Sequence, residues 1–237
     1  MYDEYKFKMI QKEFFREEAR KFKRGVRTHL RKLHCLIERL GVNANDAILE
    51  LGCGNGLHAI RLEDICREYY GIDISSEMIE SARSACRRSN FIVCDAEHLP
   101  LQDRVFDKVF CVATLHHLPR PLEALKEGVR VLKKGGVIGV AEPNPFNPVI
   151  FLDTFRYWKT ERKRLALTGI RLQSFFRNLG LGDLKKKEII FAPSDPKSLE
   201  RIYNRIDLAI EDLPILKHFG VEIILSGTRR ESLQELH

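Results

Sequence analysis

The sequence lacks the features that mark membrane-spanning, secreted and zinc-binding proteins. No apolar run approaches the ~20 residues that a helix needs to cross a bilayer, and residues 1–6 lack the apolar core of a signal peptide. The six cysteines are scattered without one Cys-x-x-Cys pair, which argues against a zinc site and against a disulfide framework. We therefore expect a protein of the reducing cytoplasm that holds no metal ion.

Composition and charge are those of a soluble globular chain with two basic segments. A length of 237 residues is enough for one α/β domain with additional segments. The composition, 44% hydrophobic and 31% charged, is ordinary for a globular protein. Of the net charge of +7, residues 1–40 contribute 12 Lys and Arg against 6 Asp and Glu, and residues 143–190 contribute 10 against 4. This excess is typical of solvated helix faces, and equally of two basic flaps that meet an anionic substrate or surface.

Apolar spacing predicts an α/β fold preceded by helix. Helical periodicity covers residues 3–40, with Gly25 as a break and Gly41 as the C-terminal cap. Short apolar runs then alternate with helical segments, which is typical of a parallel sheet covered by helices on both faces. The expected strands are 47–51, 69–74, 91–94, 108–113 and 137–141. The expected helices are 56–65, with Leu57, Ile60 and Ile65 inward, 76–86 and 121–132.

The alternation of short apolar runs with helical segments ends after Glu142. Three prolines within residues 143–148 exclude regular helix or strand there. A mixed segment follows that combines aromatic and basic residues. The last elements expected are a strand at 187–192, a helix at 199–213 and a strand at 221–226.

A glycine-rich loop follows the first expected strand, in the stretch Ile48–Leu57, "ILELGCGNGL". Glycines between a strand and a helix allow a tight turn and the close approach of a ligand. The dinucleotide fingerprint fails because Leu57 stands where the third small residue should be. Glu50 would repel a pyrophosphate but suits a ligand with a cationic amine. The loop therefore indicates a nucleoside-like ligand that is positively charged and lacks phosphate.

Two further acids end the next two strands. Asp73 closes the second strand, where a carboxylate can accept both ribose hydroxyls, and Asp95 closes the third, where it can accept from the amine of adenine. Each acid alone is more often a loop or cap residue. Three acids at successive strand ends, together with the glycine loop, favour a binding site because ligands of open α/β sheets bind outside those ends.

Several motifs together carry a family resemblance. "ILELGCGNG", "YGIDIS", "CDAEHLPLQDRVFDKVF", "LHHL" and "VLKKGGVIGVAEPN" resemble the successive motifs of the class I S-adenosylmethionine-dependent methyltransferases, in the small-molecule subgroup that includes the quinone methylases. The resemblance covers roughly residues 45–143. It implies a Rossmann-like, seven-stranded, mostly parallel sheet whose last strand is antiparallel, and S-adenosylmethionine as cofactor.

The resemblance also implies a division of the chain and a set of cofactor contacts. Residues 1–44 would form an N-terminal helical cap, 45–143 the cofactor-binding core, 144–184 a lid or substrate insertion, and 185–237 the last two strands and their helix. Glu50, Gly52, Gly54 and Gly56 would hold the methionine part, Asp73 the ribose, and Asp95 with Ala96 the adenine amine. Val112 would line the cofactor near the sulfonium, and Ile74 and Met78 would flank the adenine unless they only pack in the core.

Methyl transfer from such a cofactor is an in-line displacement, so alignment of the acceptor matters most and can supply ~7–11 kcal/mol. A base is needed only where the acceptor must lose a proton. The candidates are His116 and His117, just past the fourth strand, and Glu142 at the tip of the fifth. The alternative for the two histidines is that they only shape their loop. Asp107 opens the fourth strand at the far end and is expected to be structural.

The acceptor side leaves alternatives open. The basic N-terminal helices and the insertion are expected to select a small-molecule or lipid-like, anionic acceptor. Val149–Leu152 and Phe155, next to basic residues, would suit weak contact with an anionic membrane surface, although an ordinary amphipathic lid has the same composition. RNA methylation is supported only by positive charge, and a non-catalytic cofactor-binding regulator is the third reading. No obligate protein partner is evident.

Overall fold

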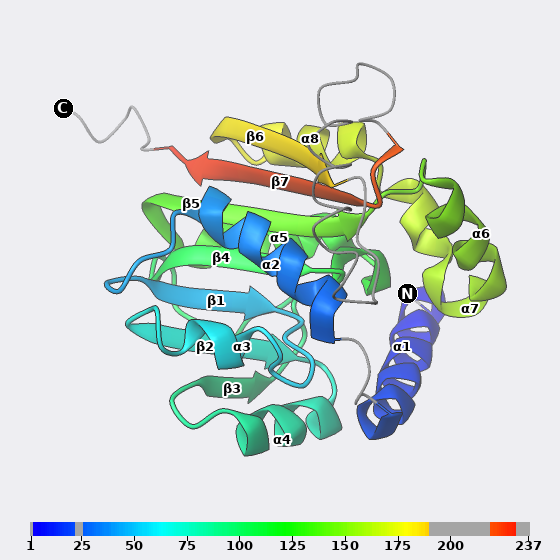
Figure 1. Ribbon diagram of the computed structural model, residues 1–237, viewed down its shortest axis with the longest axis horizontal. Helices are drawn as coiled ribbons and strands as arrows, with labels where there is room; N and C mark the ends of the chain where they lie inside the picture. The colour runs from blue at the N-terminus through cyan, green and yellow to red at the C-terminus, as the bar shows by residue number, and fades with distance from the viewer. Residues whose placement is uncertain (1, 22–25, 190–218, 231–237) are drawn as a thin grey trace, which may run out of the picture.

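The computed structural model describes residues 2–21, 26–189 and 219–230, and its centre is one seven-stranded sheet in the order β3-β2-β1-β4-β5-β7-β6 (Figure 1). The strands are β1 (Ala47–Leu51), β2 (Glu68–Asp73), β3 (Asn90–Val93), β4 (Phe106–Val112), β5 (Leu132–Pro143), β6 (Leu181–Ile189) and β7 (Glu222–Arg229). The first five pair in parallel, and β7 pairs antiparallel with both β5 and β6. The expected Rossmann-like, mostly parallel sheet with an antiparallel last strand is confirmed.

Helices cover both faces of this sheet. On one face lie α2 (Val26–Leu40), α3 (Ala59–Leu62) and α4 (Ser76–Ala85), which share a core cluster with Ile48, Phe110 and Ile224. On the other face α5 (Pro121–Val131) and α8 (Gly169–Asn178) pack on Leu49, Val109 and Leu225. Alternate strand residues point to opposite faces, so neighbouring positions such as Ile48 and Leu49 enter different clusters.

Three helices and two short 3-10 turns lie beyond the carboxyl ends of the parallel strands. Figure 1 shows α1 (Tyr2–Lys21), α6 (Pro148–Arg156) and α7 (Trp158–Glu161) on the side toward which β1 points. The turns η1 (Leu115–His117) and η2 (Arg162–Ala166) are adjacent to each other and to α7. Within the described ranges, no helix is both long and apolar enough to cross a bilayer.

The helix after the glycine loop differs from the sequence prediction. It is the single turn α3, and Ile60 and Ile65 are 44% and 45% exposed, whereas Ala59 and Leu62 are buried. The prediction of inward Ile60 and Ile65 was wrong because the loop continues to His58, which shifts the phase of the buried face. The last expected helix, 199–213, and the break at Gly25 lie outside the described residues.

The far end of the sheet is held by Asp107, as expected for a structural residue. Its Oδ2 accepts the backbone N–H of Ala47 at 2.9 Å, and Lys133 donates to Oδ1 at 2.8 Å. Burial opposes ionisation of Asp107, but these two hydrogen bonds outweigh it and hold the pKa of the carboxyl below its usual range. The residue therefore ties β1 to β4 and β5 at the end opposite the strand tips.

Candidate active site

A cavity of about 340 Å³ lies at the carboxyl ends of β1, β2, β3 and β4. That size falls in the range of ~300–1,000 Å³ typical of small-molecule sites. The loops after these strands form one wall, and α1, α7 and η2 close the opposite side. Its lining is made of Lys8, Gln11, Phe14, Phe15, Gly52, Cys53, Gly54, Asn55, Leu57, His58, Ile72, Asp73, Ile74, Met78, Cys94, Asp95, Ala96, Val112, Ala113, Thr114, His116, His117, Leu118, Pro119, Glu161 and Arg164.

The glycine loop is fixed to β2 by its own backbone. The N–H groups of Gly52 and Cys53 both donate to the carbonyl of Ile72 at 2.8 Å, and that of Gly54 donates to Asp73 Oδ2 at 3.0 Å. Gly52 has a φ of +73°, and a Cβ there would lie 2.4 Å from the Thr114 side chain. Glycine is required at this position both for its backbone conformation and for space.

Asp73 lies on the cavity wall at the end of β2. Its Oδ1 accepts the N–H of Ser75 at 2.9 Å, and Ser75 in turn caps α4 by accepting from Met78 N. Burial raises the pKa of Asp73 above its ordinary value, although the N–H donors of Ser75 and Gly54 oppose the shift. Each carboxylate oxygen keeps a second lone pair for a donor in the cavity.

Asp95 faces helix α1. Lys8 donates to Asp95 Oδ2 at 2.5 Å and lies 2.7 Å from Glu97 Oε2, and the N–H of Glu97 donates to Asp95 Oδ1. Burial opposes ionisation of Asp95, but the hydrogen bonds from Lys8 and Glu97 outweigh it and lower the pKa of the carboxyl. The ion pair therefore ties α1 to the end of β3.

Glu50 is fully buried behind the glycine loop and is not on the cavity wall. Its Oε1 lies 2.6 Å from His58 Nδ1, and Tyr69 donates its hydroxyl hydrogen to Oε2. Burial and the charge of Glu50 raise the pKa of Tyr69 well above its ordinary value, so the phenol stays protonated as the donor. Glu50 thus reaches the cavity only through His58, which lines it.

A buried dyad of His116 and Glu142 lies at the other end of the cavity. Glu142 Oε1 accepts the N–H groups of Thr114 and Leu115 at 2.9 and 2.8 Å, and Oε2 lies 2.6 Å from His116 Nδ1. Because a carboxylate only accepts, Nδ1 carries the hydrogen and Nε2 points away from Glu142. Burial alone would lower the pKa of His116, but the negative charges of Glu142 and Glu161 outweigh it and raise the pKa.

Glu161 and His117 face His116 across the cavity end. Glu161 Oε2 lies 3.2 Å from His116 Nε2 and 2.7 Å from Arg164 Nε. Burial favours the neutral acid, but His116 and Arg164 outweigh it and lower the pKa of Glu161. His117 stacks edge-on against Phe15, and burial together with the charges of His116 and Arg164 holds its pKa well below the ordinary value.

Most of the residues singled out in the sequence lie around this one cavity. The wall includes Gly52, Gly54, Asp73, Ile74, Met78, Asp95, Ala96, Val112, His116 and His117. Glu50, Gly56 and Glu142 do not line it and lie behind residues that do. Sequence reasoning missed Lys8, His58 and Glu161. The signal for Glu161 was weak: it is the one acid in the basic stretch between Lys159 and Arg164.

The sheet order, the antiparallel last strand and a cavity at the strand ends define the class I methyltransferase fold. Solved structures agree with this architecture. An S-adenosylmethionine-dependent methyltransferase from Thermotoga maritima superposes with a TM-score of 0.69 at 23% identity, covering 94% of this chain and 99% of that one. A phosphoethanolamine N-methyltransferase from Haemonchus contortus gives a TM-score of 0.62 at 15% identity, covering 85% of this chain and 53% of that one.

Sequence comparison identifies the family. Residues 49–140 match the family described as methyltransferase domain. The 27-O-demethylrifamycin SV methyltransferase of Amycolatopsis mediterranei is 27% identical over 73% of this chain and 68% of its own length. The demethylmenaquinone methyltransferase of Lactobacillus johnsonii is 32% identical over 58% of this chain and 61% of its own length. Residues 49–140 therefore match a methyltransferase domain, and together with the fold these relatives support a class I S-adenosylmethionine-dependent methyltransferase.

Proposed function

We propose that this protein transfers a methyl group from S-adenosylmethionine to an O, N or C atom of a small-molecule or lipid-like acceptor. The observation that carries the proposal is the different chemistry of the two ends of the cavity at the strand ends. Asp73, Asp95 and the glycine loop line one end, and the His116 and His117 rings line the other. One end suits a nucleoside with a cationic amine, and the other suits an acceptor atom held close to it.

The residues on the wall fit the cofactor. Asp73 would offer lone pairs to the ribose hydroxyls, Asp95 and Ala96 would meet the adenine amine, and Ile74 and Met78 would flank the ring. Gly52 and Gly54 would leave room for the methionine part, and Val112 would line the cavity near the sulfonium. When bound, the cofactor supplies an electrophilic methyl group whose bond to sulfur breaks as the acceptor atom attacks, leaving the electron pair on sulfur.

The residues behind the wall act through their neighbours. Glu50 holds His58 and thereby the loop, so we assign it a supporting role toward the methionine amine. Gly56 packs its Cα against Ala82, where a Cβ would lie 3.0 Å from the Ala82 Cβ. Glu142 makes three hydrogen bonds that fix the Thr114–His116 turn and the His116 ring. It is a positioning residue in this proposal, and His116 and His117 are the ones that meet the acceptor.

Aromatic side chains favour an acceptor with an apolar or ring-bearing body. Phe14 and Phe15 of α1 line the cavity next to His117, with the Phe15 and His117 rings edge to face at 4.8 Å between centroids. Such rings contribute apolar contact area and orient planar groups. Alignment of the acceptor with the S–CH₃ axis is the main catalytic demand, and a rigid aromatic wall serves it.

Calorimetry tests the cofactor assignment directly. S-adenosylmethionine and S-adenosylhomocysteine should bind, and NAD should not; no binding of either sulfur nucleoside at millimolar concentration would refute the proposal. Release of S-adenosylhomocysteine is then measured with quinols, phenols, phosphoethanolamine and RNA as acceptors. Turnover on RNA alone would replace the small-molecule reading, and cofactor binding without turnover on any acceptor would favour a regulator.

A finer proposal concerns the exposed face of α6. Its apolar side chains Val149, Leu152 and Phe155 are exposed, and the exposed cations Arg156 and Lys159 lie beside them. Apolar groups bordered by cations suit the boundary of an anionic lipid surface. We propose weak, salt-sensitive contact of this face with anionic membranes, where a lipid-like acceptor would be encountered.

A further inference from the structure

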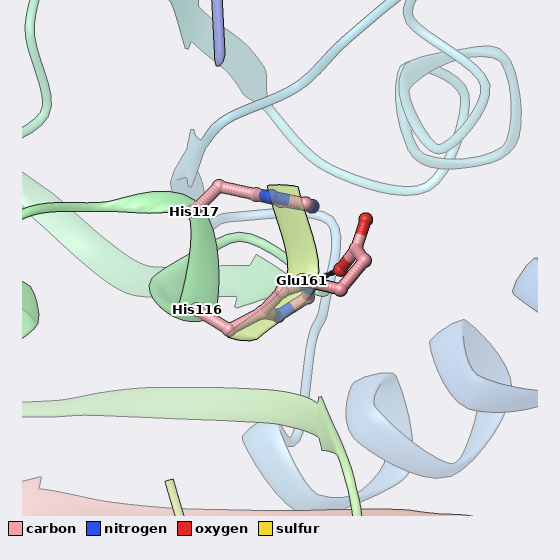
Figure 2. A group of neighbouring side chains, drawn as sticks. All are labelled: His116, His117 and Glu161. Carbon is pink, nitrogen blue, oxygen red and sulfur yellow. Dashed lines mark ion pairs between the residues drawn. The ribbon is translucent and has the colours of Figure 1, made fainter. Parts of the chain in front are cut away.

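Three metal-binding side chains converge at the acceptor end of the cavity. His116 and His117 come from the turn η1 after β4, and Glu161 comes from the end of α7, more than forty residues later. One ligand atom of each lies within 4.8 Å of the other two. Figure 2 shows the two imidazole rings and the carboxylate pointing toward one another. The fold therefore gathers two nitrogens and one carboxylate oxygen around a common point.

The atoms facing that point have no hydrogen-bond partner among the described residues. They are His116 Nε2, His117 Nδ1 and Glu161 Oε2, and all three are buried. Glu161 Oε2 is in ion-pair range of His116 Nε2 at 3.2 Å and of Arg164 Nε at 2.7 Å, but neither pair has the alignment of a hydrogen bond. Leaving buried polar atoms unsatisfied costs about 1–3 kcal/mol each. A cation that accepts one lone pair from each atom would remove this cost for His117 Nδ1 and would give His116 Nε2 and Glu161 Oε2 a well-aligned partner.

The surroundings of His116 are those of a metal-binding imidazole. Ligating histidines almost always donate the other ring N–H to a carboxylate, a backbone carbonyl or water, which fixes the tautomer and the ring orientation. Glu142 does this for His116 at 2.6 Å, and its second oxygen is held by two backbone N–H groups. The tautomer that results presents the Nε2 lone pair to the cavity.

We propose that His116, His117 and Glu161 bind one divalent transition-metal ion of the zinc class, with a coordination position left open toward the cavity. The role of that position rests on the proposed function: it would take the oxygen, nitrogen or sulfur atom of the methyl acceptor. Three protein ligands and one exchangeable position are the pattern of catalytic zinc sites.

Distances and ligand chemistry agree with a tetrahedral ion of this class. Bonds of ~2.0–2.1 Å place two ligand atoms of a tetrahedron about 3.3 Å apart, and His116 Nε2 and Glu161 Oε2 are at 3.2 Å. Imidazole ligands select zinc, cobalt, nickel and iron over magnesium, which prefers oxygen. A small movement of the His117 side chain toward His116 and Glu161 would bring the third ligand atom to a similar distance.

The local charge also favours a cation. Among the described residues around His116, Glu142, Glu161 and Glu222 supply three carboxylates, whereas Lys32 and Arg164 supply two cations. Arg164 is itself shared between Glu161 and Asp153. These carboxylates outnumber the Lys and Arg cations, so a divalent ion that displaces the proton of His116 would enter a site of net negative charge.

A bound ion would explain how an acceptor is both aligned and activated. Coordination fixes the acceptor atom at one end of the cavity, and it lowers the pKa of a bound hydroxyl or thiol. The proton leaves to solvent, the acceptor atom forms its bond to the methyl carbon, and the S–CH₃ electron pair stays on sulfur. No oxidant or reductant is involved.

The test uses the full chain, stripped of metal with a chelator and titrated with Co²⁺. One equivalent should bind with a tetrahedral visible spectrum, Zn²⁺ should displace it, and Mg²⁺ should not. His117→Ala and Glu161→Gln should weaken Co²⁺ binding by more than the ~10–100-fold typical of losing a residue that only hydrogen-bonds to a ligand. His34→Ala is the matched control, because His34 and Glu38 form an exposed His–carboxylate pair on α2; it should leave binding unchanged.

Two further measurements distinguish failure of the metal site from failure of the proposed function. S-adenosylhomocysteine binding by each variant reports that the cavity is intact, and metal binding without nucleoside binding would refute the proposed function but not the metal site. X-ray absorption of the zinc-loaded wild-type protein should show nitrogen and oxygen neighbours. Sulfur neighbours, no binding, or equal binding by wild type and Glu161→Gln would overturn the site.

Discussion

Gly52 carries two constraints that can be separated by substitution. Its φ is +73° and a Cβ would lie 2.4 Å from Thr114, whereas Gly54 has a φ of +52° and nothing within 4 Å of the corresponding position. Gly54→Ala should cost only the left-handed backbone term of ~1–2 kcal/mol. Gly52→Ala should add a clash of about 1–3 kcal/mol and displace Thr114. Denaturant unfolding measures both; equal losses would mean that the clash is relieved without cost.

Asp73 gives a pH dependence whose sign follows from its environment. Its pKa is raised by burial, so on acidification Asp73 takes up a proton at higher pH than an ordinary aspartate, while Asp95, whose pKa is lowered, stays ionised. Protonation removes an acceptor for the ribose, and S-adenosylhomocysteine affinity should fall about tenfold or more, since hydrogen bonds to charged groups contribute ~1.5–3 kcal/mol.

The matched variants for this pH dependence are Asp73→Asn and Asp183→Asn. Asp73→Asn should bind weakly at neutral pH and lose the acid-side decline, as measured by calorimetry across pH. Asp183 is exposed on β6, so its variant should follow the wild-type curve. A decline that persists in Asp73→Asn would assign the titration to another group.

For Glu50, the sequence predicts the position of the side chain but not its hydrogen-bond partners. Its position before the glycines predicts a ligand with a cationic amine, and the structure places the carboxylate near the end of β1. Its partners were not predictable, since Tyr69 and His58 reach it only when β2 pairs with β1 and the loop folds back. Tertiary contacts between distant segments leave no trace in local spacing.

At the scale of elements, α1 is held over the cavity by a few contacts. Lys8 pairs with Asp95 and Glu97, and Phe7 is buried beneath Lys163 at 4.3 Å from its ring centroid. Lys8→Ala should weaken this attachment by about 1 kcal/mol after solvent screening, raising amide exchange within α1 about fivefold. Hydrogen-exchange mass spectrometry measures it. Lys6→Ala, an exposed lysine on the same helix, should leave exchange unchanged, and equal effects would deny Lys8 its anchoring role.

Strands were easier to predict from the sequence than the helices around the site. Runs of buried residues such as Ala47–Leu51 and Val109–Val112 fix strand positions, because a parallel strand is covered on both faces. The single turn α3 was mispredicted, since apolar spacing cannot show where a glycine loop stops. Glu161 was missed for a related reason: its closeness to His116 depends on how α7 packs against η1.

At the scale of the whole molecule, charge and exposed apolar area lead to the last prediction. Val149 and Leu152 on α6 are 72% and 69% exposed beside Arg156 and Lys159. The protein, with a net charge of +7, should sediment with vesicles that contain phosphatidylglycerol at low ionic strength and dissociate as salt screens the attraction.

A double variant and a matched control assign this binding to one face. Val149→Glu with Leu152→Glu removes apolar area and adds two negative charges, so vesicle binding should fall at least tenfold. Ile170→Glu is the control, because Ile170 is 74% exposed but lies on α8. Equal losses in both proteins would mean that vesicle binding depends only on net charge. Equal binding to neutral phosphatidylcholine vesicles would mean that Arg156 and Lys159 do not contribute to it. S-adenosylhomocysteine binding should be the same in all three proteins, since none of the substituted residues lines the cavity.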